Sequence, residues 1–495
     1  MTSKESAPYA GFALNTSVEP TIAMKLRFAN LVLHLLAAMT YPAATRADVI
    51  SDWNQTASDY LNQNNANGFM RGLAMVHVAQ FDAVNAVSGG FTPYVLDVSA
   101  PGASPEAAAA QAAYTVLTNL SRANLSILNS ALTRSLAAVP DGPAKEQGRV
   151  LGRLAADTIL RLRAADNPDL PITPPPSNTP GKWRISPPNS PPGVGANARY
   201  QLPWTLRSAA QYRPGPPPAL TSAVYTADYE EVRQLGARNS AVRTADQKQA
   251  ADFHWAGDQP YLKAARQAVS LPVVESARAH ALYYMVLADA TIAFYEAQYF
   301  YNYWRPYTAI RLADSDGNDL TAPDPSWNPL WDTPNHPEYP SGTCTGTAGQ
   351  IAVLTHFYGD DFGFTASYAQ DGKTYSRTYA RLSDVPDDAV IGRIAAGGHF
   401  RTACLAGLEM GRKIARNALT QFLQPIPRLT PGSPAPPGFQ LQFVPVRPLS
   451  YVVETSADLN QWTPWLTNQY GPVLLTDPSP LSDRRFYRAV VPPLP

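Results

Sequence analysis

One short stretch, from Glu338 to Gly346, joins a proline turn to a segment of helical character. Ser341 and Gly342 fall where the predicted helix begins. The first backbone N–H groups of a helix have no partner within the helix, and the helix dipole favours negative charge there. The glycine also lets a ligand approach the backbone closely. The stretch therefore has the features of an oxyanion cradle, although a serine and a glycine at this place could equally well only cap a helix.

Two other segments supply guanidinium and imidazole groups. Arg305 follows an aromatic run and precedes a proline, and Arg393 is followed six positions later by His399. Two guanidiniums can neutralise a tetrahedral or trigonal-bipyramidal oxyanion through paired hydrogen bonds. An imidazole can bond the central atom directly, as a metal ligand or as a nucleophile. Taken alone, Arg305 could be a helix cap and His399 a buried core imidazole, but the combination indicates oxyanion chemistry.

The three segments resemble the signature of the vanadium-dependent haloperoxidase and type 2 phosphatidic acid phosphatase superfamily. That signature reads Lys-x6-Arg-Pro, then Pro-Ser-Gly-His, then Ser-Arg-x5-His. Its order and spacing match Arg305-Pro306, Pro340-Ser341-Gly342, and Arg393 with His399. The surrounding sequence is most similar to the secreted bacterial haloperoxidase-like branch, and the similarity covers most of the chain from about residue 48 to about residue 423.

The resemblance implies a vanadate cofactor, for which phosphate could substitute in the same site. It makes His399 the ligand of vanadium, or the nucleophile if the protein is a phosphatase. The residues that it implies in catalysis are His399, Arg305, Arg393 and Ser341. The residues that it implies in holding the anion are Arg305, Ser341, Gly342, Arg393 and His399, with Gln298 and Thr343 as further candidates.

The sequence departs from the signature at several positions. Gln298 replaces the lysine, Thr343 replaces the first histidine, Gly392 replaces the second serine, and Ala403 replaces an acidic residue that often follows the last histidine. A hydroxyl does not titrate near neutral pH, so Thr343 cannot act as the acid–base group. We therefore expect weakened or altered haloperoxidase activity, unless another side chain such as His336 takes over that role.

Three functions remain open on the sequence. The first is a vanadate-dependent haloperoxidase that uses hydrogen peroxide to oxidise a halide. The second is a secreted phosphatase-like enzyme that hydrolyses a phosphoester in the same pocket. The third is a non-catalytic secreted protein that binds an oxyanion or a carbohydrate, which the changes at Gln298 and Thr343 favour.

Composition and net charge restrict the class of partner and indicate where the protein acts. The 495 residues have a net charge of zero and a pI of about 7.1, which gives no electrostatic reason to expect nucleic acid as a partner. Only 16% of the residues are charged, while 48 are proline and 25 are tyrosine. This combination is typical of an exported protein with long ordered loops.

The first 47 residues are predicted to be a polar extension and a secretory signal peptide. Met24-Lys25-Leu26-Arg27 opens a basic segment, residues 28–41 are mostly apolar, and a small residue, Ala47, precedes the expected cleavage site. Met24 is a candidate for the true start. The apolar run is too short to span a membrane, and we predict no transmembrane anchor and a secreted or periplasmic location.

The fold class predicted is mainly α, with a helical-bundle haloperoxidase-like domain at residues 48–424 and long Pro-rich loops. Residues 276–303 form an apolar central helix that delivers Arg305, and Gly397-Gly398 are expected to break the backbone between Arg393 and His399. The resemblance implies that the Pro-rich stretch 168–218 helps to cover the site. Residues 425–437 are predicted to be a linker, and residues 438–495 a small β-sandwich-like module that contacts a cell surface or polysaccharide.

A disulfide between Cys344 and Cys404 is also expected. These are the only cysteines of a chain that we expect to be exported to an oxidising compartment. They follow Ser341 and His399 closely, so they should lie on helices that converge if those two residues share one anion. The alternative is a pair of buried free thiols.

Overall fold

We describe the chain from a computed structural model. The described residues are 48–64, 68–166, 177–189, 193–255, 260–370, 372–426, 428–431, 439–444, 452–467, 473–477 and 485–490. The predicted signal peptide and residues 432–438, where the predicted linker meets the β module, lie outside this part.

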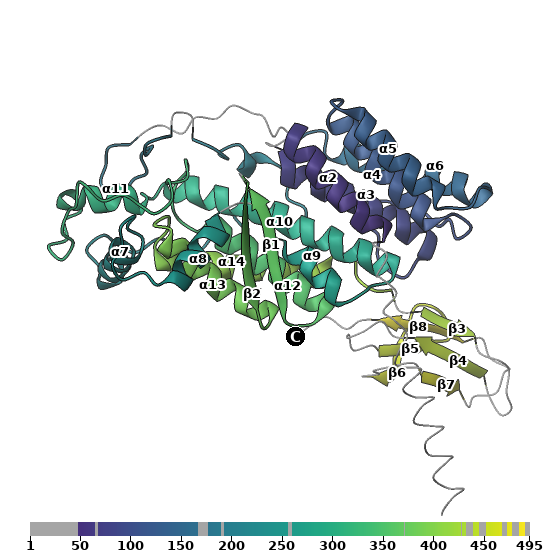
Figure 1. Ribbon diagram of the computed structural model, residues 1–495. Coiled ribbons are helices and arrows are strands. Elements are labelled where there is room, and N and C mark those ends of the chain that lie inside the picture. Colours follow the sequence, from purple (N-terminus) through teal and green to yellow (C-terminus); the bar gives the residue numbers. More distant parts are fainter. Residues whose placement is uncertain are drawn as a thin grey trace, which may run out of the picture. The chain divides into compact units, whose positions relative to one another are not determined.

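Helices make up most of the described chain (Figure 1). The α-helices are α2 (Val49–Asn64), α3 (Phe69–Ser88), α4 (Pro105–Leu120), α5 (Leu125–Ala137), α6 (Pro143–Leu162), α7 (Ala223–Leu235), α8 (Ala245–Trp255), α9 (Tyr261–Ala268), α10 (Val273–Tyr301), α11 (Pro306–Arg311), α12 (Gly342–Tyr358), α13 (Val385–Ala395) and α14 (Arg401–Gln421). The strands are β1 (Phe364–Gln370), β2 (Lys373–Tyr379), β3 (Arg428–Pro431), β4 (Phe439–Val444), β5 (Val452–Ser456), β6 (Thr463–Thr467), β7 (Val473–Asp477) and β8 (Phe486–Val490).

The long helix α10 connects the two halves of the bundle. It packs against α3, which belongs to a group formed with α2, α4, α5 and α6. It also packs against α12 and α14, which lie beside α13, and α13 in turn packs on α8. Figure 1 shows the first group together in purple and blue and the second in teal and green. Because α10 is buried nearly all round, it can hold Arg305, four residues past its end, in a fixed position.

The prediction of a mainly α helical-bundle domain is confirmed. The predicted central helix 276–303 corresponds to α10, and Ser341 is the N-cap of α12 as expected. The expected break is also present, because α13 ends at Ala395 and α14 begins at Arg401. Gly397 lies between them with φ +79°, and a Cβ there would meet the Gly236 carbonyl oxygen at 2.7 Å.

The described chain also contains a β-hairpin and a C-terminal group of β-strands. The hairpin of β1 and β2 was not predicted; its strands pair antiparallel from Phe364 opposite Tyr379 to Gln370 opposite Lys373. The C-terminal residues form two three-stranded antiparallel sheets, with orders β3-β4-β7 and β6-β5-β8. Strand β3 falls inside the segment predicted as a linker and pairs with β4. The bounds of the module remain a prediction.

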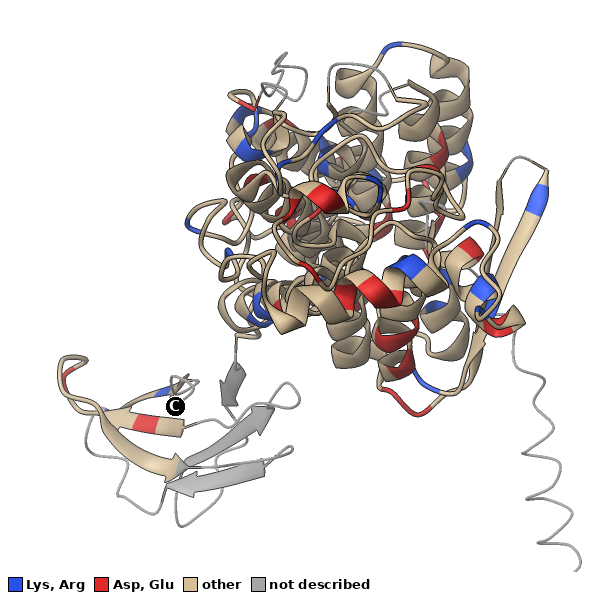
Figure 2. Ribbon diagram, turned by 90° about the vertical axis from the view of Figure 1, so that its left-hand side faces the viewer, with Lys and Arg blue, Asp and Glu red and all other residues tan. Residues whose placement is uncertain are grey.

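Charged residues of both signs occur along the helices. Figure 2 shows Lys and Arg interspersed with Asp and Glu along the helices. Among the described residues, no helix is both long and apolar enough to cross a membrane.

Helices α12 and α14 meet along a seam that leaves no room for a side chain at Gly407 or Gly411. A Cβ on Gly411 would lie 2.1 Å from the Thr345 carbonyl oxygen, and one on Gly407 would lie 2.6 Å from the Ser341 carbonyl oxygen. These are backbone atoms, which cannot turn aside as a flexible side chain could. The seam brings the start of α12 against the start of α14, and the Ser341 N–H donates to the Ala403 carbonyl at 3.0 Å.

We expect Gly411→Ala to lower the free energy of unfolding by about 2–3 kcal/mol, because the added methyl group must push the two helices apart. Urea denaturation followed by circular dichroism measures the change. Gly346→Ala, also within α12, is the matched control, since the nearest atom to its Cβ would be Leu287 Cδ2 at 3.5 Å. That variant should be neutral or gain up to about 1 kcal/mol from helix propensity. Equal effects of the two variants would contradict the seam's importance.

Candidate anion-binding site

Arg305 is the most buried cation of the site, with no exposed surface. It lies between α10 and α11, where it is the N-cap of α11. Its Nε donates to the His336 carbonyl at 2.9 Å, and its Nη1 donates to the Gly398 carbonyl at 2.8 Å. Nη1 is also 3.0 Å from His399 Nε2. The guanidinium is therefore held in place by carbonyl and imidazole groups, with no carboxylate bound to it among the described residues.

His399 is held from its other side by a glutamate. Its Nδ1 lies 3.0 Å from Glu338 Oε1, which also accepts the Phe400 N–H at 3.0 Å. Because Oε1 already accepts the Phe400 N–H, it is an acceptor for Nδ1 as well, which assigns the ring hydrogen to Nδ1 and leaves the lone pair on Nε2, facing Arg305. Burial and the positive charges of Arg305 and Arg393 hold the pKa of His399 well below its usual value. The ring is thus neutral, the form that binds a metal centre or attacks phosphorus.

Glu338 is fully buried, and its second oxygen, Oε2, has no hydrogen-bond partner in the described part of the chain. Burial raises the pKa of Glu338 to about 8, against the opposing charge of Arg305. Sequence reasoning did not assign this residue a role. A carboxylate three residues before Ser341, in a segment that is otherwise aromatic and proline-rich, was the available signal. Position 403, where an acidic residue was expected to follow His399, is an alanine that lines the same small hollow as Glu338.

His336 contacts Arg305 from a second side, and Gln298 in turn contacts His336. The Gln298 amide donates through Nε2 to the Pro340 carbonyl at 2.7 Å, and its Oε1 lies 2.7 Å from His336 Nδ1. Nη2 of Arg305 lies 3.1 Å from Nδ1 and 3.3 Å from Nε2 of the same imidazole. Gln298 is fully buried, while His336 keeps part of its surface exposed. Gln298 is therefore linked to Arg305 through the His336 imidazole, and it brings no charge of its own to the site.

The N-terminus of α12 carries the serine, glycine and threonine of the candidate cradle. Ser341 is buried, and its Oγ accepts the Cys344 N–H at 3.4 Å, as an N-cap does. Gly342 and Thr343 are half-buried. A Cβ on Gly342 would lie 2.9 Å from the Phe294 ring, so the aromatic side chain closes directly on the backbone there.

Arg393 approaches from α13 and is 4% exposed. Its Nη1 donates to the His254 carbonyl at 3.2 Å, and its guanidinium lies 4.2 Å from the centre of the Trp255 ring. Its Nε is buried without a hydrogen-bond partner among the described residues. Burial lowers the pKa of Arg393 to about 10 and that of Arg305 to about 9, so both are charged at neutral pH.

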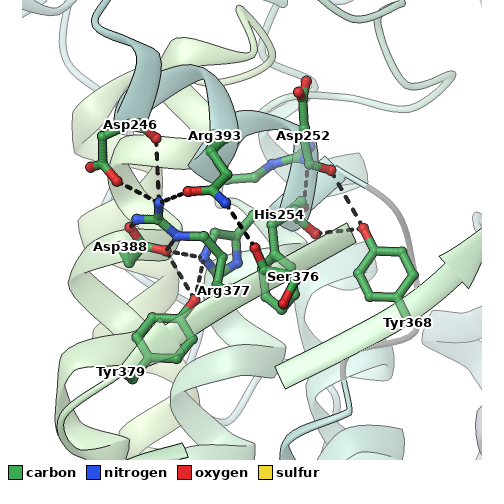
Figure 3. Close-up of polar contacts among 11 residues, drawn as sticks. Asp246, Asp252, His254, Tyr368, Ser376, Arg377, Tyr379, Asp388 and Arg393 are labelled. Atoms are coloured by element: carbon green, nitrogen blue, oxygen red, sulfur yellow. Dashed lines mark hydrogen bonds and ion pairs between the residues drawn. The ribbon is translucent and has the colours of Figure 1, made fainter. Parts of the chain in front are cut away.

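Helix α8 positions Arg393 because it packs very closely on α13. A Cβ on Gly392 would lie 2.7 Å from the Ala250 carbonyl oxygen, which explains why no serine side chain occupies this position. The two helices are also joined by polar contacts around Asp388 (Figure 3). Asp388 accepts from Arg377, from Tyr379 at 2.9 Å and from His254 Nε2 at 2.9 Å. Arg377 also binds Asp246 of α8, at 2.6 Å.

The predicted disulfide between Cys344 and Cys404 is wrong for this structure, in which both are buried free thiols. The convergence that motivated it is nevertheless present, because the two side chains are hydrogen-bonded to each other. Burial opposes ionisation of Cys344, but hydrogen bonds from Cys404 and Ser341 and the charge of Arg393 lower its pKa overall. The thiols thus lie behind the candidate cradle as hydrogen-bonding groups.

Part of the Pro-rich stretch covers one side of the site, in agreement with the expectation from the resemblance. Val194 donates to the Asn335 carbonyl at 2.9 Å and accepts from the Tyr299 hydroxyl at 2.5 Å. Gly195, with φ +75°, lies flat on the Tyr295 ring, which packs edge-on against His336. A cavity of about 340 Å³ lies under this segment, lined by residues of α3, α10 and the loop, including Arg71, Thr291 and Tyr295.

The charges of the site fit an anion. Two buried guanidiniums face one carboxyl group whose ionisation is itself disfavoured, so the pocket has excess positive charge. Buried charges without a counterion cost several kcal/mol, and an anion would remove that cost. Within the described residues, no three His, Cys, Asp or Glu side chains gather as metal ligands usually do. The donor set, with one imidazole lone pair, two guanidiniums and a helix N-terminus, fits vanadate or phosphate.

Asp388→Asn tests whether the network behind Arg393 stabilises the fold. Burial would raise the pKa of Asp388, but hydrogen bonds from His254 and Arg377 lower it to about 2. Because the folded-state pKa is below the unfolded value, the stabilisation is present above pH 4 and lost as the pH falls towards 2. We expect the variant to be about 2–4 kcal/mol less stable at pH 7, with a difference that narrows below pH 4.

Chemical denaturation at several pH values measures this difference. Asp387→Asn is the matched control, because Asp387 is the exposed neighbour on the same helix. A gap between wild type and Asp388→Asn that stays constant down to pH 2.5 would contradict the assignment.

Comparison with known proteins agrees with this geometry. Residues 278–427 match the sequence model of the VCPO second helical-bundle domain. None of the curated proteins matches the sequence significantly. Among solved structures, a bacterial vanadium-dependent iodoperoxidase is similar with a TM-score of 0.63 and 22% identity, over 75% of this chain and 96% of that one.

Two structures of bacterial vanadium-dependent chloroperoxidase are also similar. The holo-type structure has a TM-score of 0.56 at 15% identity, over 77% of this chain and 93% of that one. The apo-type structure has a TM-score of 0.57 at 15% identity, over 72% of this chain and 93% of that one. The matched domain contains Arg305, Ser341, Arg393 and His399, and the bundle around them has the same fold as these enzymes. Residues 278–427 are thus similar in sequence to the VCPO second helical-bundle domain, and the chain has the helical-bundle fold of the vanadium haloperoxidases.

Proposed function

We propose that the protein is a vanadate-dependent haloperoxidase-like enzyme, which uses hydrogen peroxide to oxidise a halide. The observation that carries the proposal is the pairing of His399 with two buried guanidiniums that lack a carboxylate partner in the described chain. Such a site gains most from a bound oxyanion with several oxygens. When bound, vanadate would supply a Lewis-acidic centre that activates peroxide towards halide.

Each residue has a defined part in this proposal. His399 would bind the vanadium through Nε2, because Glu338 holds the ring hydrogen on Nδ1. Arg305 and Arg393 would bind the oxygens and neutralise their charge, and Ser341 and Gly342 would add donors at the start of α12. Gln298 and Thr343 lie at the edge of the set and provide no charge, so we propose weaker stabilisation of the anion than a lysine would give.

A phosphohydrolase is the second candidate, and the His399–Glu338 contact favours it. A neutral imidazole whose Nδ1–H is bound by an acceptor oxygen, here Glu338 Oε1, is a good nucleophile through Nε2. Nε2 would attack phosphorus, the bond to the ester oxygen would break, and that oxygen would take up a proton. Phosphate and vanadate have nearly the same shape and charge, so one pocket can serve either reaction.

We also propose that the protein is exported, because residues 24–47 have the features of a signal peptide, although they lie outside the described part. Hydrogen peroxide and halide, or a phosphoester, would then be met outside the cytoplasm.

Arg393→Ala tests the anion site directly. Loss of one charge-assisted guanidinium contact should weaken the binding of vanadate and of phosphate roughly ten- to a hundredfold. Isothermal titration of the full chain measures both affinities. Arg416→Ala, an exposed arginine of α14, is the matched control and should bind as the wild type does. Absence of binding of either anion to the wild type at millimolar concentration would refute the proposed site.

A paired assay on the wild-type protein separates the candidate functions. Peroxide-dependent bromination that requires added vanadate supports the haloperoxidase, and release of phosphate from an aryl phosphate supports the phosphohydrolase. Binding of the anions without either reaction supports a non-catalytic binding protein and refutes both enzymatic proposals.

A further inference from the structure

Both proposed reactions need a proton to move at an oxygen next to the bound anion, and Thr343 cannot move it. Peroxide must lose a proton when it binds, and a departing ester oxygen must gain one. Such transfer requires a titratable group within hydrogen-bonding distance of the reacting oxygen, directly or through one water. Among the described residues, the titratable side chains within hydrogen-bonding distance of Arg305 are His399 and His336. Since His399 is assigned to the central atom, His336 is the remaining group.

Gln298 determines which nitrogen of His336 carries the hydrogen. Two carbonyl oxygens lie next to Nδ1: Gln298 Oε1 at 2.7 Å and the Pro337 carbonyl at 3.2 Å. The orientation of the amide is fixed, because Gln298 Nε2 donates to the Pro340 carbonyl at 2.7 Å. The donor Arg305 Nη2 is also near Nδ1, at 3.1 Å, but Gln298 Oε1 is closer, so we assign the hydrogen to Nδ1, which donates it to Gln298. Nε2 then keeps its lone pair.

Arg305 lies against both ring nitrogens of His336, with its Nη2 at 3.1 Å from Nδ1 and 3.3 Å from Nε2. Because Nδ1 donates to Gln298, Nε2 is the nitrogen that can accept from this guanidinium. Nη1 of the same guanidinium is 3.0 Å from His399 Nε2. One guanidinium therefore lies between the lone pairs of two imidazoles. An anion bound by Arg305 would lie within reach of both rings, with His399 at its centre and His336 at its edge.

We infer that His336 is the proton-transfer residue of this pocket and that Gln298 is the positioning residue that keeps its Nε2 free to accept a proton. This inference rests on the proposed function. In the peroxidase reaction, an O–H bond of peroxide breaks, an N–H bond forms at Nε2, and this proton then passes to the oxygen that leaves as water. In the phosphatase reaction, protonated Nε2 gives its proton to the departing ester oxygen, and the ring takes a proton back from the water that then displaces His399 from phosphorus.

The glutamine explains why the family lysine would be unsuitable here. A lysine ammonium has three donors and no acceptor, so it could not receive the hydrogen of Nδ1. It would also add a third positive charge beside Arg305. The changes at positions 298 and 343 are therefore consistent with the role of His336. The proton-transfer group is on the loop before α12 instead of on the helix itself. The lysine is replaced by a glutamine that accepts the hydrogen bond of His336.

The surroundings of His336 suit a base. The charged and titratable groups around it are Arg305, Arg393, His399 and Tyr295, and the glutamine is neutral. Burial and the charge of Arg305 hold the pKa of His336 well below its usual value, so the ring is neutral at neutral pH. A bound anion offsets the charge of Arg305, which raises that pKa and favours proton uptake when the reaction needs it.

Histidine-labelled protein and inorganic phosphate test the inference without turnover. NMR of the wild-type full chain should show His336 as the Nδ1–H tautomer at pH 7, and phosphate should raise the pKa of its imidazole. In Gln298→Lys the ring should lose this tautomer preference. The Nε2–H tautomer in the wild type, or an imidazole signal that does not respond to bound phosphate, would overturn the inference.

His336→Ala tests the role in turnover. We expect the rate of whichever reaction the wild type performs to fall by roughly 10²–10⁴-fold, while phosphate affinity changes by less than about tenfold. The acidic limb of the pH–rate profile should disappear, and added imidazole should restore part of the rate. His356→Ala, an exposed histidine at the far end of α12, should leave rate and profile unchanged.

These measurements keep the two proposals separate. A His336→Ala variant with the wild-type rate and pH profile would overturn the role of His336 and leave the proposed function standing. A wild type that binds phosphate but turns over nothing would overturn the proposed function, and the NMR titration would still decide whether His336 responds to the anion as inferred.

Discussion

The structure of the site follows from two guanidinium groups that are buried without a carboxylate partner in the described chain. Arg305 and Arg393 are each surrounded by neutral groups: carbonyl oxygens, imidazoles and, for Arg393, an indole ring. An uncompensated buried charge is unfavourable, and the bundle must supply the free energy that keeps it there. The nearly all-round burial of α10 and the close contact of α8 with α13 are the parts of the fold that do so.

Much of this arrangement could be predicted from the sequence because it depends on local rules. Ser341 caps a helix for the reasons that make serine a good N-cap, and α10 is apolar nearly all round because it is central. Gly397 breaks the path between Arg393 and His399, where φ +79° suits only a glycine well. Resemblance to a known signature then identified which of these local features belong to one site.

What the sequence did not reveal depends on contacts between distant segments. The role of Glu338 is visible only when His399, 61 positions away, is placed beside it. The hairpin of β1 and β2 alternates Phe364, Ala366 and Tyr368 with more exposed residues, and this face packs against the core. Its contact with α13 through Arg377, Tyr379 and Asp388 depends on segments that are apart in the sequence. The disulfide was inferred from export and proximity; the proximity is present, but the sulfur atoms remain thiols.

The glycine seam between α12 and α14 has a mechanical consequence for the site. Ser341 immediately precedes one of these helices and His399 lies two residues before the other, and the contact between them is backbone against backbone at Gly407 and Gly411. Side chains in ordinary helix contacts can change rotamer and let helices slide, whereas a joint of this kind has no such freedom. The distance between the serine and the histidine is therefore stiff. A stiff distance suits a pocket that must hold an anion as its geometry changes during a reaction, since little reorganisation of the protein is then needed.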